Sequence, residues 1–160
     1  MATTLTHRAF STPGSGSGGN VLERLLAKAR PLVMGVLNIT PDSFSDGGRH
    51  LDPQAAMVHA RRLAAEGADI LDVGAESTRP YGGAVRISLE EERARLAPLL
   101  SDVIALGVPV SIDTLKAAIA AWALDLGAAI VNDVGACKAM PTWLASWPST
   151  KRPSLSCTIA

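Results

Sequence analysis

Polar side chains stand at the ends of four successive apolar runs, and these residues are the best placed to do chemistry. They are Asn38, Asp72, Asp113 and the pair Asn132 and Asp133. In parallel α/β folds, ligands bind beyond the carboxyl ends of the strands. One polar residue at a strand end is ordinarily explained by its approach to solvent. Four in succession predict that the side chains converge on one mouth.

Two long polar loops follow the first two runs. The first, residues 38–48, reads NITPDSFSDGG and carries Phe44 among acids and hydroxyl groups. The second, residues 76–80, reads ESTRP, in which Thr78 and Arg79 suit a phosphate or a carboxylate, because a guanidinium fork matches such oxygens. Turn chemistry in the first loop and a surface arginine in the second are the ordinary alternatives.

The motifs SIDT (111–114) and NDV (132–134) follow the third and fourth runs. A buried aspartate and an asparagine amide supply an acceptor and a donor side by side, as the edge of a flat heterocycle requires. Taken singly, each motif is explained as well by a helix N-cap or a satisfied turn.

The elements that position these residues alternate between strand and helix. The run PLVMGVLN (31–38) is typical of a parallel strand buried on both faces. Three further strands are predicted at ADILDVG (68–74), VPVSID (108–113) and AAIVND (128–133). Such repeated units indicate a parallel sheet with crossover helices.

Capping signals mark the helices between these strands. Asp52 is an expected N-cap with Pro53 at the first helical position, and a capping box opens at Ser88. Pro98 lies inside that second helix and is expected to kink it. A third helix is predicted over residues 115–126.

Composition excludes several functional classes. The 160 residues are 48% hydrophobic, with 15 basic and 15 acidic side chains and only 4% aromatics. The chain therefore has no basic excess for nucleic acid or an anionic membrane, and few aromatics on which bases could stack. No apolar run reaches the roughly 18 residues of a membrane span. Two cysteines make no disulfide framework, so we expect a cytoplasmic protein.

In this order, NITPDSFSDGG, GADILDVGAESTRP, SIDT and NDV resemble the dihydropteroate synthase family over residues 31–134. The resemblance implies a (β/α)8 TIM barrel of which about the first four β/α units are present. It implies transfer of a pterinylmethyl group in folate biosynthesis: 6-hydroxymethyl-7,8-dihydropterin diphosphate and 4-aminobenzoate give 7,8-dihydropteroate and pyrophosphate. Mg2+ is the implied cofactor, and sulfonamides are the implied competitors of 4-aminobenzoate.

The same resemblance assigns roles to individual positions. Asn38 matches the metal and diphosphate position, Thr78 matches a substrate-binding threonine, and Arg79 serves the same region. Asp113 and Asn132 match residues that bind the pterin edge.

Four further positions complete the implied site. Val134 is expected to contact the pterin ring. Phe44, Asp46 and Pro80 match mobile loops that close over 4-aminobenzoate.

The chain is expected to divide into a flexible segment 1–19, a partial pterin-binding barrel 20–136 and a tail 137–160 without the family pattern. Later family features are missing: a further pterin-binding Asp, a Lys in a Ser-Arg-Lys-like segment and a terminal Arg-x-His pair. Residues 150–160 can be encoded by a set of codons that has a second reading. When the same bases are read two positions later, they encode a sequence that resembles the family's fifth strand. We therefore hypothesise a frameshift, which sequencing the gene past codon 135 tests.

We expect this chain to be inactive by itself, although intact family members are often homodimeric enzymes. Two alternatives remain open: a non-catalytic pterin-binding or interaction fragment, and another pterin-binding barrel such as a methyltetrahydrofolate methyltransferase. The expected partners are small-molecule substrates.

Overall fold

The computed structural model describes residues 21–40, 52–76, 86–133 and 154–157. The segment 1–19 and most of the tail 137–160 lie outside the described residues. The elements in chain order are α1 (Val21–Leu26), β1 (Met34–Asn38), α2 (Pro53–Ala65), β2 (Ile70–Gly74), α3 (Leu89–Leu96), α4 (Leu100–Ile104), β3 (Val110–Asp113), α5 (Ala117–Leu126), β4 (Ile130–Asp133) and β5 (Ser154–Cys157). The four strands predicted from the sequence are confirmed.

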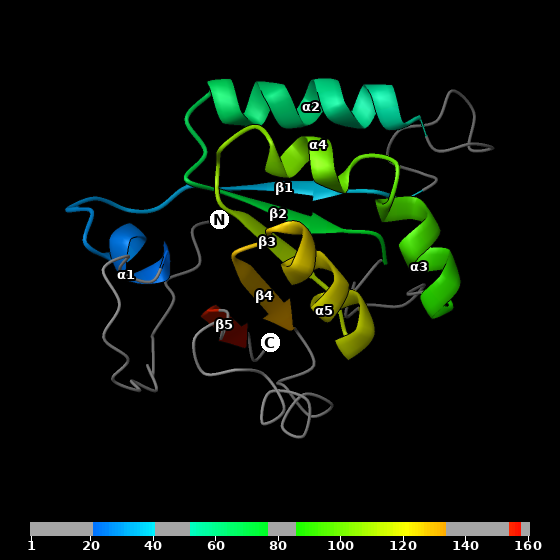
Figure 1. Ribbon diagram of the computed structural model, residues 1–160. Helices are drawn as coiled ribbons and strands as arrows, with labels where there is room; N and C mark the ends of the chain where they lie inside the picture. Colours follow the sequence, from blue (N-terminus) through cyan, green and yellow to red (C-terminus); the bar gives the residue numbers. More distant parts are fainter. Residues whose placement is uncertain (1–20, 41–51, 77–85, 134–153, 158–160) are drawn as a thin grey trace.

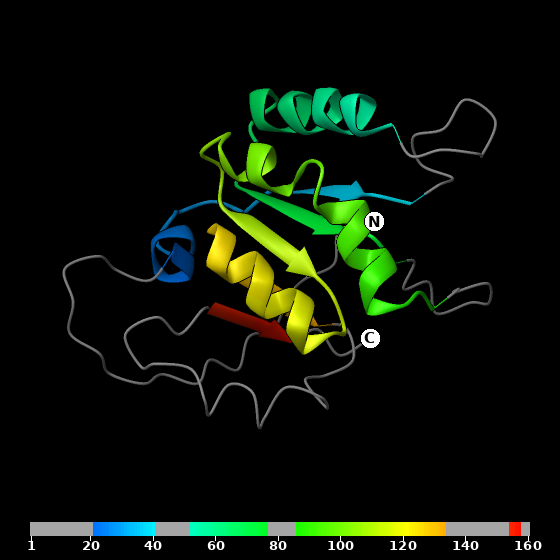
Figure 2. The ribbon, with the colours of Figure 1, turned by 45° about the vertical axis from the view of Figure 1, so that its right-hand side comes forward.

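The strands form one parallel sheet in the order β1-β2-β3-β4-β5. Helices α2, α3, α4 and α5 lie over one face of this sheet, and α1 lies beside the starts of the strands (Figures 1 and 2). Each of the first three strands returns through helical structure to its parallel neighbour. This arrangement is the repeated β/α unit expected of part of a (β/α)8 barrel.

The core lies between the sheet and these helices. Strand residues of one parity, such as Leu71, Val73 and Ile112, are fully buried and pack with apolar residues of the helices. Gly35 allows α2 to approach β1, since a Cβ atom there would lie 3.2 Å from the Cβ of Leu63. No described helix is long and apolar enough to cross a membrane.

Strand β1 is not buried on both faces, which corrects the expectation from its apolar sequence. Gly35 and Leu37 are buried, whereas Met34 and Val36 are 41% and 51% exposed. The reason is that β1 lies at the end of the strand order and the helices cover only one of its faces. The other face corresponds to the inner face of a barrel.

The predicted kink at Pro98 is a complete break. Helix α3 ends at Leu96 and α4 begins at Leu100, so Pro98 lies between two separate helices. A proline lacks the amide proton that would continue the helix, and its ring clashes with the preceding turn. The two predicted caps are confirmed: Asp52 accepts from the amide of Gln54 at 2.8 Å, and Ser88 accepts from that of Glu91 at 3.1 Å.

Strand β5 was not expected, because the tail shows no β/α pattern in the sequence. Ser154–Cys157 pairs with Ile130–Asp133 in parallel register. The sheet therefore has one more strand than the four predicted units supply.

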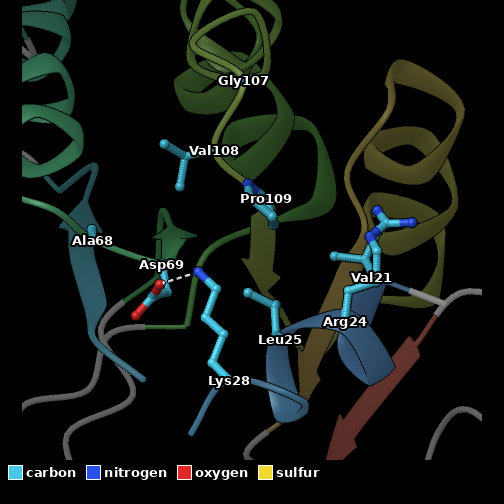
Figure 3. Close-up of a pocket in the computed structure, with 9 residues that line it drawn as sticks. All are labelled: Val21, Arg24, Leu25, Lys28, Ala68, Asp69, Gly107, Val108 and Pro109. Atoms are coloured by element: carbon cyan, nitrogen blue, oxygen red, sulfur yellow. Dashed lines mark hydrogen bonds and ion pairs between the residues drawn. The ribbon is translucent and has the colours of Figure 1, made fainter. Parts of the chain in front are cut away.

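An ion cluster ties the start of β1 to the start of β2. Asp69, whose side chain is 3% exposed, accepts from Lys28 at 2.5 Å and from Arg30 at 2.7 and 2.8 Å. It also accepts from the amide of Val33 at 3.0 Å. Figure 3 shows the Lys28 side chain reaching Asp69 from the segment after α1. The hydrogen bonds from Arg30, Lys28 and Val33 hold the pKa of Asp69 well below its usual range.

We predict that Asp69→Asn lowers the midpoint of thermal unfolding at pH 7. Because the pKa of Asp69 is depressed in the folded state, its stabilisation is present above the unfolded value of 3.8 and is lost as the pH falls below it. The difference in unfolding midpoint between Asp69→Asn and the parent should therefore shrink below pH 4. Circular dichroism melts from pH 2 to 7 measure this.

Glu66→Gln is the control for this prediction, because the Arg62–Glu66 pair is exposed and within one helix. A midpoint for Asp69→Asn equal to that of the parent at pH 7 would contradict the role given to this cluster.

Candidate functional site

Three of the predicted site residues occupy one row across the sheet. The strand register places Asn38 beside Gly74, Gly74 beside Asp113, and Asp113 beside Asn132. Residues in register on neighbouring strands share a face, because side chains alternate along each strand. The row lies at the carboxyl ends of the strands, on the face opposite helices α2–α5. The sheet therefore brings Asn38, Asp113 and Asn132 together, as the sequence predicted.

Asp133 does not join this row, which corrects the expectation that it shares the mouth. It follows Asn132 directly and so lies on the other face of β4. It is buried there, with 2% exposure.

A second row lies one step further inside. It contains Asp72, which was expected at this mouth without a specific ligand contact, and Ser111, which was expected only as part of the SIDT motif. It consists of Val36, Asp72, Ser111 and Ile130 in register. Asp72 and Ser111 are buried, and the Asn132 amide nitrogen donates to Asp72 at 3.1 Å. This bond joins the two rows. The alternation of polar residues at positions 72, 111 and 113 is the signal that could have identified them.

Three buried oxygens of these rows have no hydrogen-bond partner among the described residues. They are Oδ1 of Asp72, Oγ of Ser111 and Oδ1 of Asp113. An unsatisfied buried polar group costs about 1–3 kcal/mol, so most proteins pair such groups. Their gathering on one face indicates a surface built to hydrogen-bond a polar ligand.

Carboxylates crowd this end of the sheet and change the protonation of the central one. Burial, with the charges of Asp72, Glu92, Asp133 and Glu76, raises the pKa of Asp113 to about 7. Burial also raises the pKa of Asp72, although the nearby Ser111 hydroxyl and Asn132 amide oppose the shift. A carboxyl group that is partly protonated near neutral pH can both donate and accept a hydrogen bond.

Gly74 provides the space that Asp113 occupies. A Cβ atom at position 74 would lie 3.2 Å from the Cβ of Asp113 and 3.4 Å from its Oδ2. Contacts this short require the neighbouring side chain to shift. The glycine is therefore part of the geometry of the row, although it carries no functional group.

The other predicted residues lie outside the described residues. These are Phe44 and Asp46 of the first loop, Thr78, Arg79 and Pro80 of the second loop, and Val134 after β4. Their positions relative to the row therefore stay predictions. Asn38, the predicted metal ligand, is described and is exposed at the end of β1.

A hollow of about 300 Å³ lies at the opposite end of the sheet. Its walls come from α1, the start of β2 and the turn before β3 (Figure 3). The acid that lines it, Asp69, is already saturated by Lys28, Arg30 and Val33. In barrels of this type the amino-terminal end of the strands contributes to stability and the carboxyl end to function. We therefore place the candidate site at the polar rows.

A parallel β/α sheet with polar rows at the carboxyl ends of its strands defines part of a (β/α)8 barrel with a ligand site at that end. Comparison with known proteins identifies which barrel. The chain belongs to the pterin binding enzyme family, whose profile matches residues 34–147. That match continues past residue 135, where the sequence pattern was expected to stop.

Individual relatives are dihydropteroate synthases. The chain is 47% identical over 115 residues to the enzyme of Bacillus subtilis, covering 71% of this chain and 40% of that protein. The Xanthomonas albilineans enzyme, solved with 4-aminobenzoic acid, matches with a TM-score of 0.64 and 47% identity over 73% of this chain and 43% of that one. The Anaplasma phagocytophilum enzyme, solved with 6-hydroxymethylpterin-monophosphate, matches with a TM-score of 0.61 and 45% identity over 72% and 45%. The chain thus spans less than half the length of these relatives.

We predict that Asp113→Asn makes the folded chain more stable at pH 8 and leaves it nearly unchanged at pH 4. The folded state binds a proton at Asp113 that the unfolded chain releases near pH 4, so stability falls as the pH rises from about 4 to about 7. Asparagine resembles the protonated acid and removes this loss. Urea unfolding at both pH values should give a difference of about 4 kcal/mol at pH 8, since the pKa of Asp113 rises from 3.8 to about 7.

The opposite ranking, with Asp113→Asn less stable than the parent at pH 8, would show that the carboxylate is favourably paired there. Asp125→Asn is the control, since Asp125 is an exposed aspartate of α5 and lies outside the polar rows.

Proposed function

We propose that this chain carries part of the active site of a dihydropteroate synthase. The enzyme would condense 6-hydroxymethyl-7,8-dihydropterin diphosphate with 4-aminobenzoate, giving 7,8-dihydropteroate and pyrophosphate for folate biosynthesis. The observation that carries this proposal is the row Asn38, Gly74, Asp113 and Asn132 above the buried Asp72. The high identity to synthases solved with these kinds of ligand supports it.

In this proposal the polar rows bind the edge of the pterin ring. That edge presents an amino group, a ring nitrogen and a carbonyl within a few ångströms. Asp113, with a pKa of about 7, can accept from or donate to it, and Asn132 supplies an amide with both functions. The unpaired oxygens of Asp72 and Ser111 add acceptors deeper in the site. A flat heterocycle with mixed donors and acceptors therefore suits this face better than a purely anionic ligand.

The diphosphate would lie toward the end of the rows, near Asn38 and the second loop. Thr78 and Arg79 are the proposed binding pair, since a hydroxyl and a guanidinium complement phosphate oxygens. Loss of pyrophosphate leaves a cation on the pterin methylene, and the arylamine of 4-aminobenzoate attacks it. This substitution requires no protein nucleophile.

Asn38 fits a proposed Mg2+ site as one of few protein ligands. Its exposed amide offers the hard oxygen that Mg2+ prefers, and this ion usually keeps waters and substrate phosphates as its other ligands. Among the described residues no group of three or more His, Cys, Asp or Glu forms a metal cage. The ion would neutralise charge on the departing diphosphate.

The remaining proposed contacts concern 4-aminobenzoate. Phe44, Asp46 and Pro80 are proposed to close over it, and Val134 to touch the pterin ring. Exclusion of water by such loops would protect the cation from hydrolysis. The full enzyme is proposed to be cytoplasmic and homodimeric.

A turnover assay with both substrates and Mg2+ tests the proposed function. We expect this chain to bind the pterin diphosphate but to release little or no pyrophosphate, because the Lys and Arg donors expected later in the family are missing from its sequence. Binding without release favours the alternative of a non-catalytic pterin-binding fragment for this chain as it stands. Rescue of a synthase-deficient strain by the chain would contradict the expected inactivity, and absence of pterin binding would contradict the site itself.

We predict that Gly74→Ala weakens binding of 6-hydroxymethylpterin at least about tenfold, a loss on the order of 1.4 kcal/mol. The new methyl group would press on the Asp113 side chain and force it to shift by a few tenths of an ångström. Isothermal titration calorimetry measures the affinity.

Gly35→Ala is the matched control, because its Cβ would meet Leu63 at 3.2 Å on the helix-covered face instead. It should lower stability and leave pterin affinity within about twofold. Equal affinities for Gly74→Ala and the parent would refute the role given to the row.

A further inference from the structure

Two cations hold the chain where it leaves β2. Ala75 and Glu76 follow β2, and Glu76 is the first residue of the second loop and the last described residue before residue 86. Arg95 of α3 donates to the Ala75 carbonyl oxygen at 2.9 Å. Lys116, which precedes α5, donates to Oε2 of Glu76 at 2.5 Å. Consecutive residues of the β2 exit are therefore tied to two different elements.

Lys116 also binds a second, fully buried carboxylate. Its Nζ donates to Oε2 of Glu92 at 2.6 Å, and the Glu92 side chain has no exposure. The other oxygen of Glu92 accepts from the Thr114 hydroxyl at 2.6 Å, and Thr114 Oγ1 accepts from the Lys116 amide at 3.1 Å. Each buried carboxylate of this network thus has a defined partner.

Burying the charges of this network costs free energy, so stability alone does not explain the network. The side chains of Glu76 and Lys116 are only 9% and 23% exposed. Burial opposes ionisation, yet the bonds to Glu76 and Glu92 raise the pKa of Lys116, so the lysine stays charged. Apolar residues of similar size often stabilise a protein as well as a buried ion network does. What such a network adds is a fixed arrangement of the three segments it joins.

We propose that Lys116 is a positioning residue that fixes Glu76, and thereby the start of the second loop, for binding of the diphosphate. Thr78 and Arg79, the diphosphate ligands of the proposed function, follow Glu76 in the sequence by two and three residues. Glu92 holds Lys116 from the opposite side, and Arg95 adds a second tie at Ala75. The proposal rests on the proposed function, because it assigns the diphosphate to that loop.

The first test needs no substrate. In Lys116→Met the backbone amide of Glu76 should change from a rigid NMR order parameter of about 0.85 to below about 0.6. Lys116→Arg keeps the cation and should restore most of the order. Lys28→Met is the matched control, because Lys28 pairs with Asp69 at the other end of the same strand. Should Lys116→Met fail to fold, Glu76→Gln removes the ion pair with a smaller perturbation.

The second test compares two ligands that differ in the diphosphate. The parent should bind 6-hydroxymethylpterin diphosphate more tightly than 6-hydroxymethylpterin. Lys116→Met should bind the diphosphate at least about tenfold more weakly than the parent does and should bind 6-hydroxymethylpterin equally well. Lys28→Met should keep both affinities.

The two tests separate the possible failures. An unchanged order parameter at Glu76 in Lys116→Met overturns the positioning role, whatever binds. Equal losses for both ligands overturn it in favour of a general structural role. A third outcome is that Lys116→Met loses order at Glu76 while the parent binds the two ligands equally well. That outcome overturns both the positioning role and the proposed diphosphate site.

Discussion

The period-two alternation of parallel strands is the constraint on which the candidate site depends. Four strands in register place Asn38, Gly74, Asp113 and Asn132 in one row although they are far apart in sequence. A shift of one residue in any strand would move its polar residue to the helix-covered face. The apolar residues that alternate with them prevent that shift, because they must stay buried against the helices. Core and site are therefore specified by the same alternation.

The same geometry concentrates negative charge, and the fold manages it in different ways at the two ends of β2. Asp69 at the start is neutralised by two exposed cations and stays ionised. At the other end, Lys116 satisfies Glu76 and Glu92, while Asp113 has no cation among its described partners and takes up a proton near neutral pH. A group left in this state contributes little to stability and is suited to binding a polar ligand.

Local sequence signals predicted the elements well, since Asp52, Ser88 and the apolar runs act through near neighbours. The row residues Asn38, Asp113 and Asn132 were predictable because each ends a strand. Asp72 was expected at the same mouth, but its bond to Asn132 was not predicted, because it spans 60 residues. The Lys116–Glu76 contact spans 40 residues and was missed for the same reason. The exposure of Met34 and Val36 depends on which neighbours the sheet has, a property that no local pattern carries.

That exposure has a consequence for handling the protein. Strand β1 pairs with β2 on one side, and in the described part of the chain its other edge presents backbone donors and acceptors next to half-exposed apolar side chains. Edges of this kind promote pairing between molecules and aggregation. We therefore expect β1 to be a site at which molecules associate. A lysine in place of Val36 would put a charge at this edge and leave the helix-covered core intact.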